Sequence, residues 1–144
     1  MDKFIYEGKV MWSQIDSNRH LRHSAYADFA AQARLEFLTH LGFNSAILNS
    51  HQLGPILFRE EIIYHKEVGA NETIHVTCVI TKWNPEKGYW SFTQELYRSD
   101  KVKAATIIVD GAWLNLANRK LTVLPQTLSP LFSQIIGGAS CKKS

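Results

Sequence analysis

The sequence predicts an α+β protein in which one long helix packs against an antiparallel sheet. A single segment of helical period, residues 25–41, stands in a chain that otherwise reads as strands, most of them from Leu57 onward. The later strands are joined by short connections such as the turn over residues 84–88, and tight connections imply antiparallel pairing. One sheet with an apolar face and one helix able to cover it form a two-layer arrangement.

Composition and charge fit one ordinary globular domain spanning residues 1–144. Apolar residues make up 45% of the chain and charged residues 20%, and this length buries a core without disulfides or metal. The formal charge of +3 is scattered, which argues against nucleic-acid binding. Cys78 and Cys141 lack the spacing of a zinc site or disulfide framework. No apolar run approaches about 18 residues and no signal peptide is evident, so we expect a cytoplasmic protein without membrane insertion.

The long helix carries start and stop signals as well as a period. Ser24 can serve as its N-cap, Gly42 suits the position after its last residue, and Phe43 can fold back on the last turn. Alanines in the helix allow the backbone to approach a sheet closely. One apolar stripe follows the helical period: Tyr26, Phe29, Ala30, Ala33, Phe37 and Leu41.

The remaining chain divides into strands and connectors. Alternating apolar and polar residues predict strands over 3–13, 58–68, 74–81, 89–97 and 102–116. Gly111 is a candidate bulge, and residues 44–55 read as a connector. Ser129 and Pro130 predict a cap and first residue of a short C-terminal helix that ends at Gly137-Gly138. Residues 136–144 are expected to form a flexible tail.

Two stretches resemble a known family. The run Asp16-Ser17-Asn18-Arg19-His20-Leu21, with Tyr26 ten residues after the aspartate, resembles the signature of hotdog-fold acyl-CoA thioesterases. The likeness is closest to the 4-hydroxybenzoyl-CoA and acyl-ACP thioesterase branch, and it extends through residues 64–67 to Pro125. The resemblance implies a hotdog fold: a five-stranded antiparallel sheet wrapped around the long helix, plus a short C-terminal helix. Arg22-His23 replaces a pair of asparagines in the family pattern.

The resemblance also implies a function and an assembly. The implied reaction is hydrolysis of an acyl-CoA or acyl-ACP thioester to a free acid and a thiol, within lipid metabolism and without a metal or redox cofactor. The implied assembly is a homodimer or homotetramer with active sites at the subunit interface. The alternatives are a hotdog dehydratase or isomerase, and a non-catalytic protein that binds acyl thioesters. The H-x-F-P-G-type segment of hotdog dehydratases is absent, which argues against dehydration.

Asp16 is the predicted catalytic residue. The resemblance implies that it attacks the thioester carbonyl or activates water, and a carboxylate ionised at neutral pH can do either. His20 and Asn18 are predicted to assist, by holding Asp16 and by positioning water. The plainer interpretations are that Asp16 caps a turn and that the other two are solvated loop residues. Metal binding by Asp16, His20 and His23 is disfavoured because their spacing does not match a common zinc motif.

Four further residues are predicted to contact substrate. Backbone amides around His23 and Ser24, at the start of the helix, are candidates for holding the oxyanion. The side chains of His23, Ser24 and Tyr26 are expected to line the substrate path. Glu60 lies on a strand face where alternation predicts an apolar residue, so it is either a site residue or a strand-end charge.

Other polar and aromatic residues have structural interpretations. Arg34 and Glu36 are read as a structural residue and a solvated helix charge. The remaining aromatic residues of note are read as core or interface: Trp83, Trp90 and Trp113.

Overall fold

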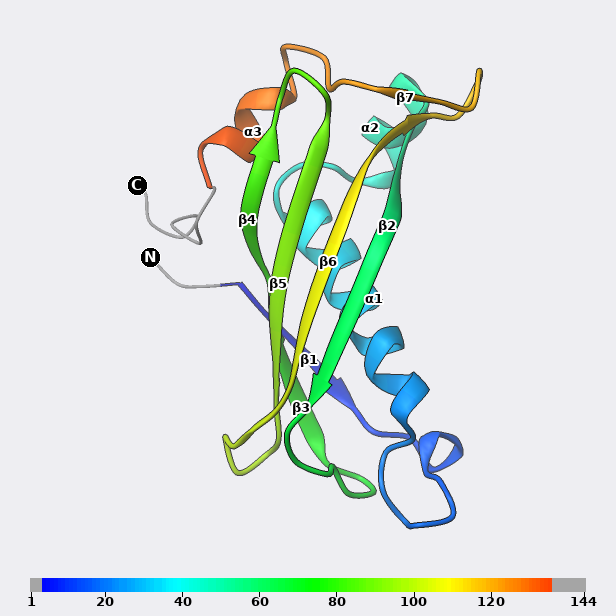
Figure 1. Ribbon diagram of the computed structural model, residues 1–144, viewed down its shortest axis with the longest axis vertical. Helices are drawn as coiled ribbons and strands as arrows, with labels where there is room; N and C mark the ends of the chain where they lie inside the picture. The colour runs from blue at the N-terminus through cyan, green and yellow to red at the C-terminus, as the bar shows by residue number, and fades with distance from the viewer. Residues whose placement is uncertain (1–3, 136–144) are drawn as a thin grey trace.

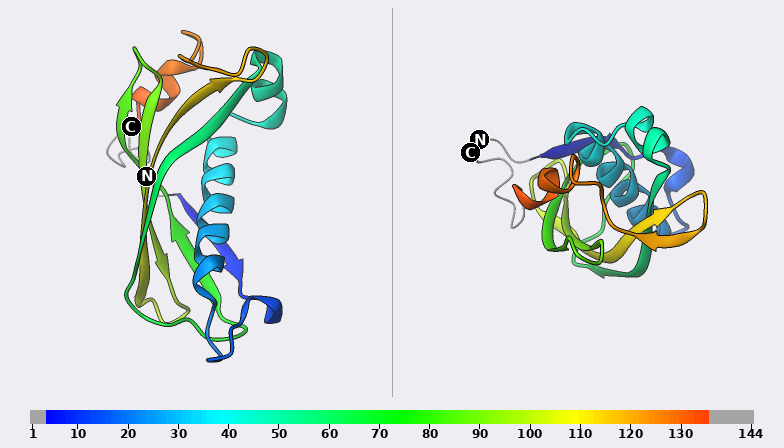
Figure 2. Two further views of the ribbon diagram at one scale, coloured as in Figure 1. Left: turned by 45° about the vertical axis from the view of Figure 1, so that its right-hand side comes forward. Right: turned by 90° about the horizontal axis from the view of Figure 1, so that it is seen from above.

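The computed structural model describes residues 4–135. Within them, seven antiparallel strands form one sheet in the order β1-β3-β5-β6-β2, with β4 paired to β5 and β7 to β6. The sheet curves around α1 (Figure 2). The elements in chain order are β1 (Ile5–Lys9), η1 (Trp12–Gln14), α1 (His23–His40), α2 (Ser45–His51), β2 (Leu53–Tyr64), β3 (Thr73–Thr77), β4 (Val79–Asn84), β5 (Tyr89–Tyr97), β6 (Lys103–Asn115), β7 (Lys120–Thr122) and α3 (Ser129–Ser133).

The predicted hotdog architecture is confirmed, although several element boundaries differ from the predictions. The described part of the sheet counts seven strands rather than five because a predicted strand divides at Cys78 into β3 and β4, and because β7 was not predicted. The first strand ends at Lys9 rather than continuing through Trp12, which is 87% exposed in η1. The segment predicted as a connector contains α2, whose seven residues are too few to show a helical period in the sequence.

The alanine face of α1 lies directly on the sheet. Ala25, Ala30 and Ala33 are completely buried, and the helix contacts β1, β3 and β6. Tyr26 and Phe37 are also buried, as the predicted stripe requires. Small side chains bring the two backbones together, so that large aromatic residues fill the space on either side. Within the described chain no helix is both long and apolar enough to cross a membrane.

The C-terminal end of α1 is closed as predicted. Gly42 has a φ of +105°, and its amide donates to the carbonyl of Thr39 at 3.0 Å. The amide of Phe43 donates to the carbonyl of Leu38 at 2.8 Å, which completes a Schellman motif. The fully buried ring of Phe43 stacks on Trp113 at a centroid distance of 5.4 Å. The helix is therefore fixed at this end by backbone hydrogen bonds and aromatic packing together.

The short helix α3 covers the same end of the molecule as α2 (Figure 1). Ser129 is its first residue and Leu128 its N-cap, so the prediction that Ser129 caps the helix is wrong. Phe132 is fully buried and contacts the rings of Phe43 and Trp83. The predicted helix end at Gly137-Gly138 and the predicted tail over 136–144 lie outside the described residues.

A β-bulge interrupts the pairing of β2 with β6. Leu57 pairs with Gly111 and Arg59 pairs with Asp110, so Phe58 is the extra residue. The prediction of a bulge at Gly111 is therefore wrong. The bulge lies in β2, and Gly111 is the residue of β6 that pairs next to it. A Cβ atom at Gly111 would overlap the carbonyl oxygen of Ile56 and the ring of Trp90.

We expect Gly111→Ala to lower the free energy of unfolding by about 2 to 3 kcal/mol, because the new methyl group meets a backbone atom that can move only if β2 separates from β6. Urea denaturation measures this change. Gly69→Ala is the matched control, since its Cβ would lie an ordinary 3.4 Å from Glu72 Oε2, and we expect a loss within about 1 kcal/mol. Equal losses in both variants would contradict this account of the bulge.

Candidate active site

A polar loop, residues 10–22, lies at the N-terminal end of α1 beside the segment that follows β2 (Figure 1). The amide of Leu21 donates to the carbonyl of Val68 at 2.7 Å, and the amide of Val10 donates to the carbonyl of Glu72 at 2.9 Å. These backbone hydrogen bonds join two parts of the chain that are about fifty residues apart. They hold the loop that contains Asp16 against the end of the sheet.

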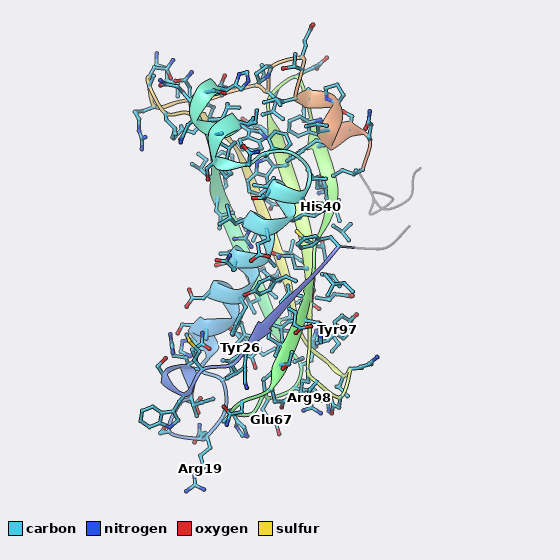
Figure 3. All side chains as sticks on the ribbon, turned by 180° about the vertical axis from the view of Figure 1, so that it is seen from behind. Arg19, Tyr26, His40, Glu67, Tyr97 and Arg98 are labelled. Carbon is cyan, nitrogen blue, oxygen red and sulfur yellow. The ribbon has the colours of Figure 1, made fainter. Side chains whose placement is uncertain are left out.

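The side chain of Asp16 is half-buried, and only one of its two carboxylate oxygens accepts hydrogen bonds from the described residues. Its Oδ1 atom accepts hydrogen bonds from the amides of Asn18 at 2.9 Å and His20 at 3.1 Å, an Asx turn that shapes the loop. Between residues 4 and 135 its Oδ2 atom has no hydrogen-bond partner. At the tip of this loop Arg19 has a φ of +68° and points away from the body (Figure 3). One oxygen thus organises the turn while the other stays available.

The first turn of α1 has no side-chain cap. Its N-cap residue is Arg22, whose side chain makes no capping hydrogen bond; Arg22 Nη1 donates instead to the carbonyl of Ser13 at 2.8 Å. The prediction that Ser24 caps the helix is wrong, because Ser24 lies inside it and its Oγ accepts from Arg22 Nε at 3.0 Å. The amide of Ala25 donates to the carbonyl of Arg22 at 3.0 Å. In the described structure the amides of His23 and Ser24 have no protein acceptor, so they can bind an anion.

A pocket of about 320 Å³ joins the loop to the helix start. Three of the predicted site residues line it: Asp16, His23 and Tyr26. The other four do not: Asn18, His20, Ser24 and Glu60. Of these, His20 and Asn18 reach the pocket only through the backbone amides that hold Asp16. The roles assigned to all seven residues stay predictions.

The far wall of this pocket comes from the end of β2 and the residues after it. Leu21 and four residues that the sequence analysis did not assign to the site complete the lining: Tyr64, His65, Lys66 and Glu67. The available signal was the resemblance itself, which includes residues 64–67. Strand alternation did not predict that these residues line the pocket. Alternation indicates which side of the sheet a residue faces, and not which loop packs against that side.

Two tyrosines connect the helix to this wall. The rings of Tyr26 and Tyr64 lie perpendicular at a centroid distance of 5.0 Å, and Tyr64 Oη donates to the carbonyl of His23 at 3.1 Å. Burial raises the pKa of Tyr26, and the neighbouring Tyr64, Glu67 and Asp16 raise it further. The Tyr26 hydroxyl therefore keeps its proton at neutral pH and can donate it in a hydrogen bond.

The charged residues farther along the helix are held by structural contacts. Arg34 Nη1 donates to Oε1 of Gln94 at 2.8 Å, and Nε2 of this buried glutamine donates to the carbonyl of Ala30 at 2.9 Å. Burial lowers the pKa of Arg34, and the nearby Cys78 and Glu60 act in the opposite direction by raising it. Glu60 is exposed on the helix-facing side of β2.

Glu36 is likewise an exposed helix charge, and it accepts a hydrogen bond from Gln32 at 3.0 Å. No three His, Cys, Asp or Glu side chains of residues 4–135 are grouped so that they could hold a metal ion. Trp90 and Trp113 are buried, and Trp83 is partly buried against the core.

Comparisons with known proteins agree with this fold. The family model described as "Thioesterase-like superfamily" matches residues 10–132. No curated protein matches the chain. Three similar solved structures share the fold. A Staphylococcus aureus protein in complex with CoA has a TM-score of 0.84 at 18% identity, covering 92% of this chain and 82% of that one.

The other two similar structures are named as thioesterases. The DHNA-CoA thioesterase of Staphylococcus aureus has a TM-score of 0.78 at 19% identity, covering 86% of this chain and 82% of that one. The 1,4-dihydroxy-2-naphthoyl-CoA thioesterase of Synechocystis has a TM-score of 0.78 at 16% identity, covering 92% and 96%.

Proposed function

The chain belongs to the thioesterase-like superfamily, whose reaction is thioester hydrolysis, and we propose that it hydrolyses an acyl-CoA at the pocket between Asp16 and the start of α1. One observation carries this proposal: within the described residues, Asp16, which has a carboxylate oxygen without a partner, and His23, whose amide at the start of α1 is unpaired, line the same pocket. The similar structure in complex with CoA supports a CoA thioester over an ACP thioester. A cytoplasmic location stays a prediction.

The proposed reaction begins when the thioester carbonyl lies against the amides of His23 and Ser24. These donors and the helix dipole stabilise the oxyanion that forms when the carbonyl carbon is attacked. Asp16 Oδ2 either attacks the carbonyl carbon itself or takes a proton from a water molecule that attacks it. The bond from the carbonyl carbon to sulfur breaks and the CoA thiolate takes up a proton, which in the water route comes from Asp16. In the direct route the acyl group stays on Asp16 as an anhydride, and water hydrolyses it to release the acid and free the carboxylate. The hydroxyl of Tyr26 on α1 donates to the carbonyl of Lys66, and that of Tyr64 on the facing wall donates to the carbonyl of His23, so the two tyrosines hold the walls of the pocket together.

We expect Asp16→Asn to lower kcat at least about 100-fold in a thiol-release assay over a panel of acyl-CoAs. An asparagine carbonyl can still accept the hydrogen bonds from residues 18 and 20, so the loop survives and only the charge is lost. Glu60→Gln is the comparison variant, since Glu60 does not line this pocket and takes no part in the proposed bond-breaking steps, so we expect thiol release to be retained.

Other outcomes of the same assay support other functions. Loss of activity only in Glu60→Gln would place the chemistry on β2. Turnover of enoyl- or hydroxyacyl-CoA without thiol release would identify a dehydratase or isomerase. Ligand binding that Asp16→Asn leaves unchanged, with no thiol released from any acyl-CoA, would identify a binding protein.

The role of the unpaired amides is tested by supplying the missing cap. In Arg22→Asn the new carbonyl can accept from the first-turn amides, whereas Arg22→Ala removes the same arginine without adding an acceptor. We expect the asparagine variant to be about 1 kcal/mol more stable than the alanine variant in urea denaturation. We expect its kcat to be about ten-fold lower, because the side chain competes with the oxyanion. Equal kcat values despite the gain in stability would show that these amides take no part.

We propose that a second copy of the chain pairs with β2. In the described structure this strand pairs only with β6, so its other edge is open along 12 residues. Phe58, Ile63 and Tyr64 on this edge are exposed, and a long apolar edge strand invites pairing with another strand. Because β2 leads into the pocket wall at residues 64–67, a partner paired here would lie next to the site.

Sedimentation equilibrium should then give at least twice the chain mass of 16.4 kDa. We expect Ile63→Lys to raise the dimer dissociation constant at least about ten-fold, because it places a charge in the apolar interface. Ile5→Lys is the matched control on β1, the opposite edge of the sheet, where Ile5 is similarly exposed. A monomeric wild-type chain, or equal weakening by both substitutions, would contradict pairing through β2.

A further inference from the structure

A second, apolar pocket of about 160 Å³ opens between α1 and the first half of β2. Apart from Arg34 its lining residues are apolar, and two of them are exposed to solvent, Leu35 at 50% and Leu57 at 43%. Its other wall is buried and aromatic, made by Trp90, Trp113 and Phe132. Exposed apolar side chains in front of a recess usually mark a place where an apolar group binds.

The two pockets lie along the same face of α1. His23 lines the polar pocket, and Ala31 and Leu35 line the apolar one. Together with Ala27 these residues are spaced four apart, so they form one row along the helix. Between the two pockets this row contains only Ala27, so no long side chain of the row separates them.

The facing wall is β2, and it also runs from one pocket to the other. Tyr64 lines the polar pocket and Leu57 the apolar one. Between them, Ile62 and Glu60 share the helix-facing side of the strand, because they pair with the buried Ile107 and Val109. The bulge at Phe58 keeps Leu57 on this same side despite the odd spacing. Both walls therefore lead from the proposed thioester position to the apolar pocket.

We propose that this apolar pocket binds the far end of a linear acyl chain, and that the substrates are acyl-CoAs of about 10 to 14 carbons. The proposal rests on the proposed function, since it places the thioester carbonyl at the start of α1. It assigns Ala31, at the entrance, as the residue that determines chain length.

The chain length follows from two dimensions. From Ser24 to Ala31 the helix rises about 10 Å at 1.5 Å per residue. An extended chain advances roughly 1.2 Å per bond, so about eight or nine bonds cover this distance. A cavity of about 150 Å³ holds a molecule of six carbons, which is close to the volume of this pocket. The aromatic wall ends the path, so an acyl chain much longer than 14 carbons does not fit.

The wild-type protein tests this without any substitution. We measure kcat/KM by thiol release for saturated acyl-CoAs of 2 to 18 carbons. We expect a maximum between 10 and 14 carbons, at least about ten-fold above butanoyl-CoA, because the additional methylene groups leave water. A maximum at six carbons or fewer, a flat profile, or a preference for an aromatic acyl group would overturn the proposal.

Variants that fill the pocket test the assignment of the residues. We expect Ala31→Phe to lower the ratio of kcat/KM for dodecanoyl-CoA to that for hexanoyl-CoA about ten-fold, because the ring occupies the entrance. Gln32→Phe adds the same ring at the next, exposed position outside the pocket, and we expect its ratio to equal that of the wild type. Leu57→Trp fills the pocket from the opposite wall and is used if the first variant does not fold. An unchanged ratio in the folded variants would overturn the assignment.

Binding separates this proposal from the proposed function. In calorimetry with wild-type protein, we expect dodecanoic acid to bind at least about ten-fold more tightly than hexanoic acid, whether or not any thioester is cleaved. Thiol release that depends on Asp16 but shows no preference for chain length would overturn only the apolar pocket. Tight binding of dodecanoic acid without thiol release from any acyl-CoA would overturn only the hydrolysis.

Discussion

The contact between the alanine face of α1 and the sheet is the constraint on which the rest of the structure depends. Ala25, Ala30 and Ala33 have no exposed surface, and close packing of this kind resists sliding because any shift opens a void or creates a clash. The Schellman motif at Gly42 fixes one end of the helix. At the other end, the hydrogen bond from Tyr64 Oη to the carbonyl of His23 ties the first turn to β2. The uncapped helix start is thus held in one position.

The candidate site uses backbone amides that helix formation leaves without a partner. Every helix begins with amides that have no partner within it, and most helices satisfy some of them with a side-chain cap. Here the N-cap residue, Arg22, makes no such bond, and the amides of His23 and Ser24 stay unpaired in the described structure. Asp16 adds a carboxylate with one oxygen committed to the turn. The helix thus lacks a stabilising cap at the place where the family resemblance puts the reaction, and such departures from the most stable local arrangement are common at functional sites.

Several errors of the sequence-based predictions have identifiable physical causes. Ser24 has the side chain of a good cap, but Arg22 already has the extended backbone of an N-cap, so the helix starts one residue earlier than Ser24. α2 has only seven residues, about two turns, which is too short for a helical period to show, and only its Ile47 and Leu48 pack against the core. The bulge lies at Phe58 rather than at Gly111, since a glycine is needed wherever a neighbouring backbone comes close and not only where a strand bulges.

The sequence by itself determined the type of the main elements, the extent of the long helix to within two residues and its glycine stop, whereas Asp16 was identified through the family resemblance. These features depend on residues within a few positions of one another, where the 3.6-residue and two-residue periods act. Only the tertiary structure decided that residues 64–67 face Asp16, that Phe58 shifts the register of β2, and that two pockets lie along one side of α1. Strand pairing and loop docking join residues tens of positions apart, and no local pattern in a single sequence records which partner each segment meets.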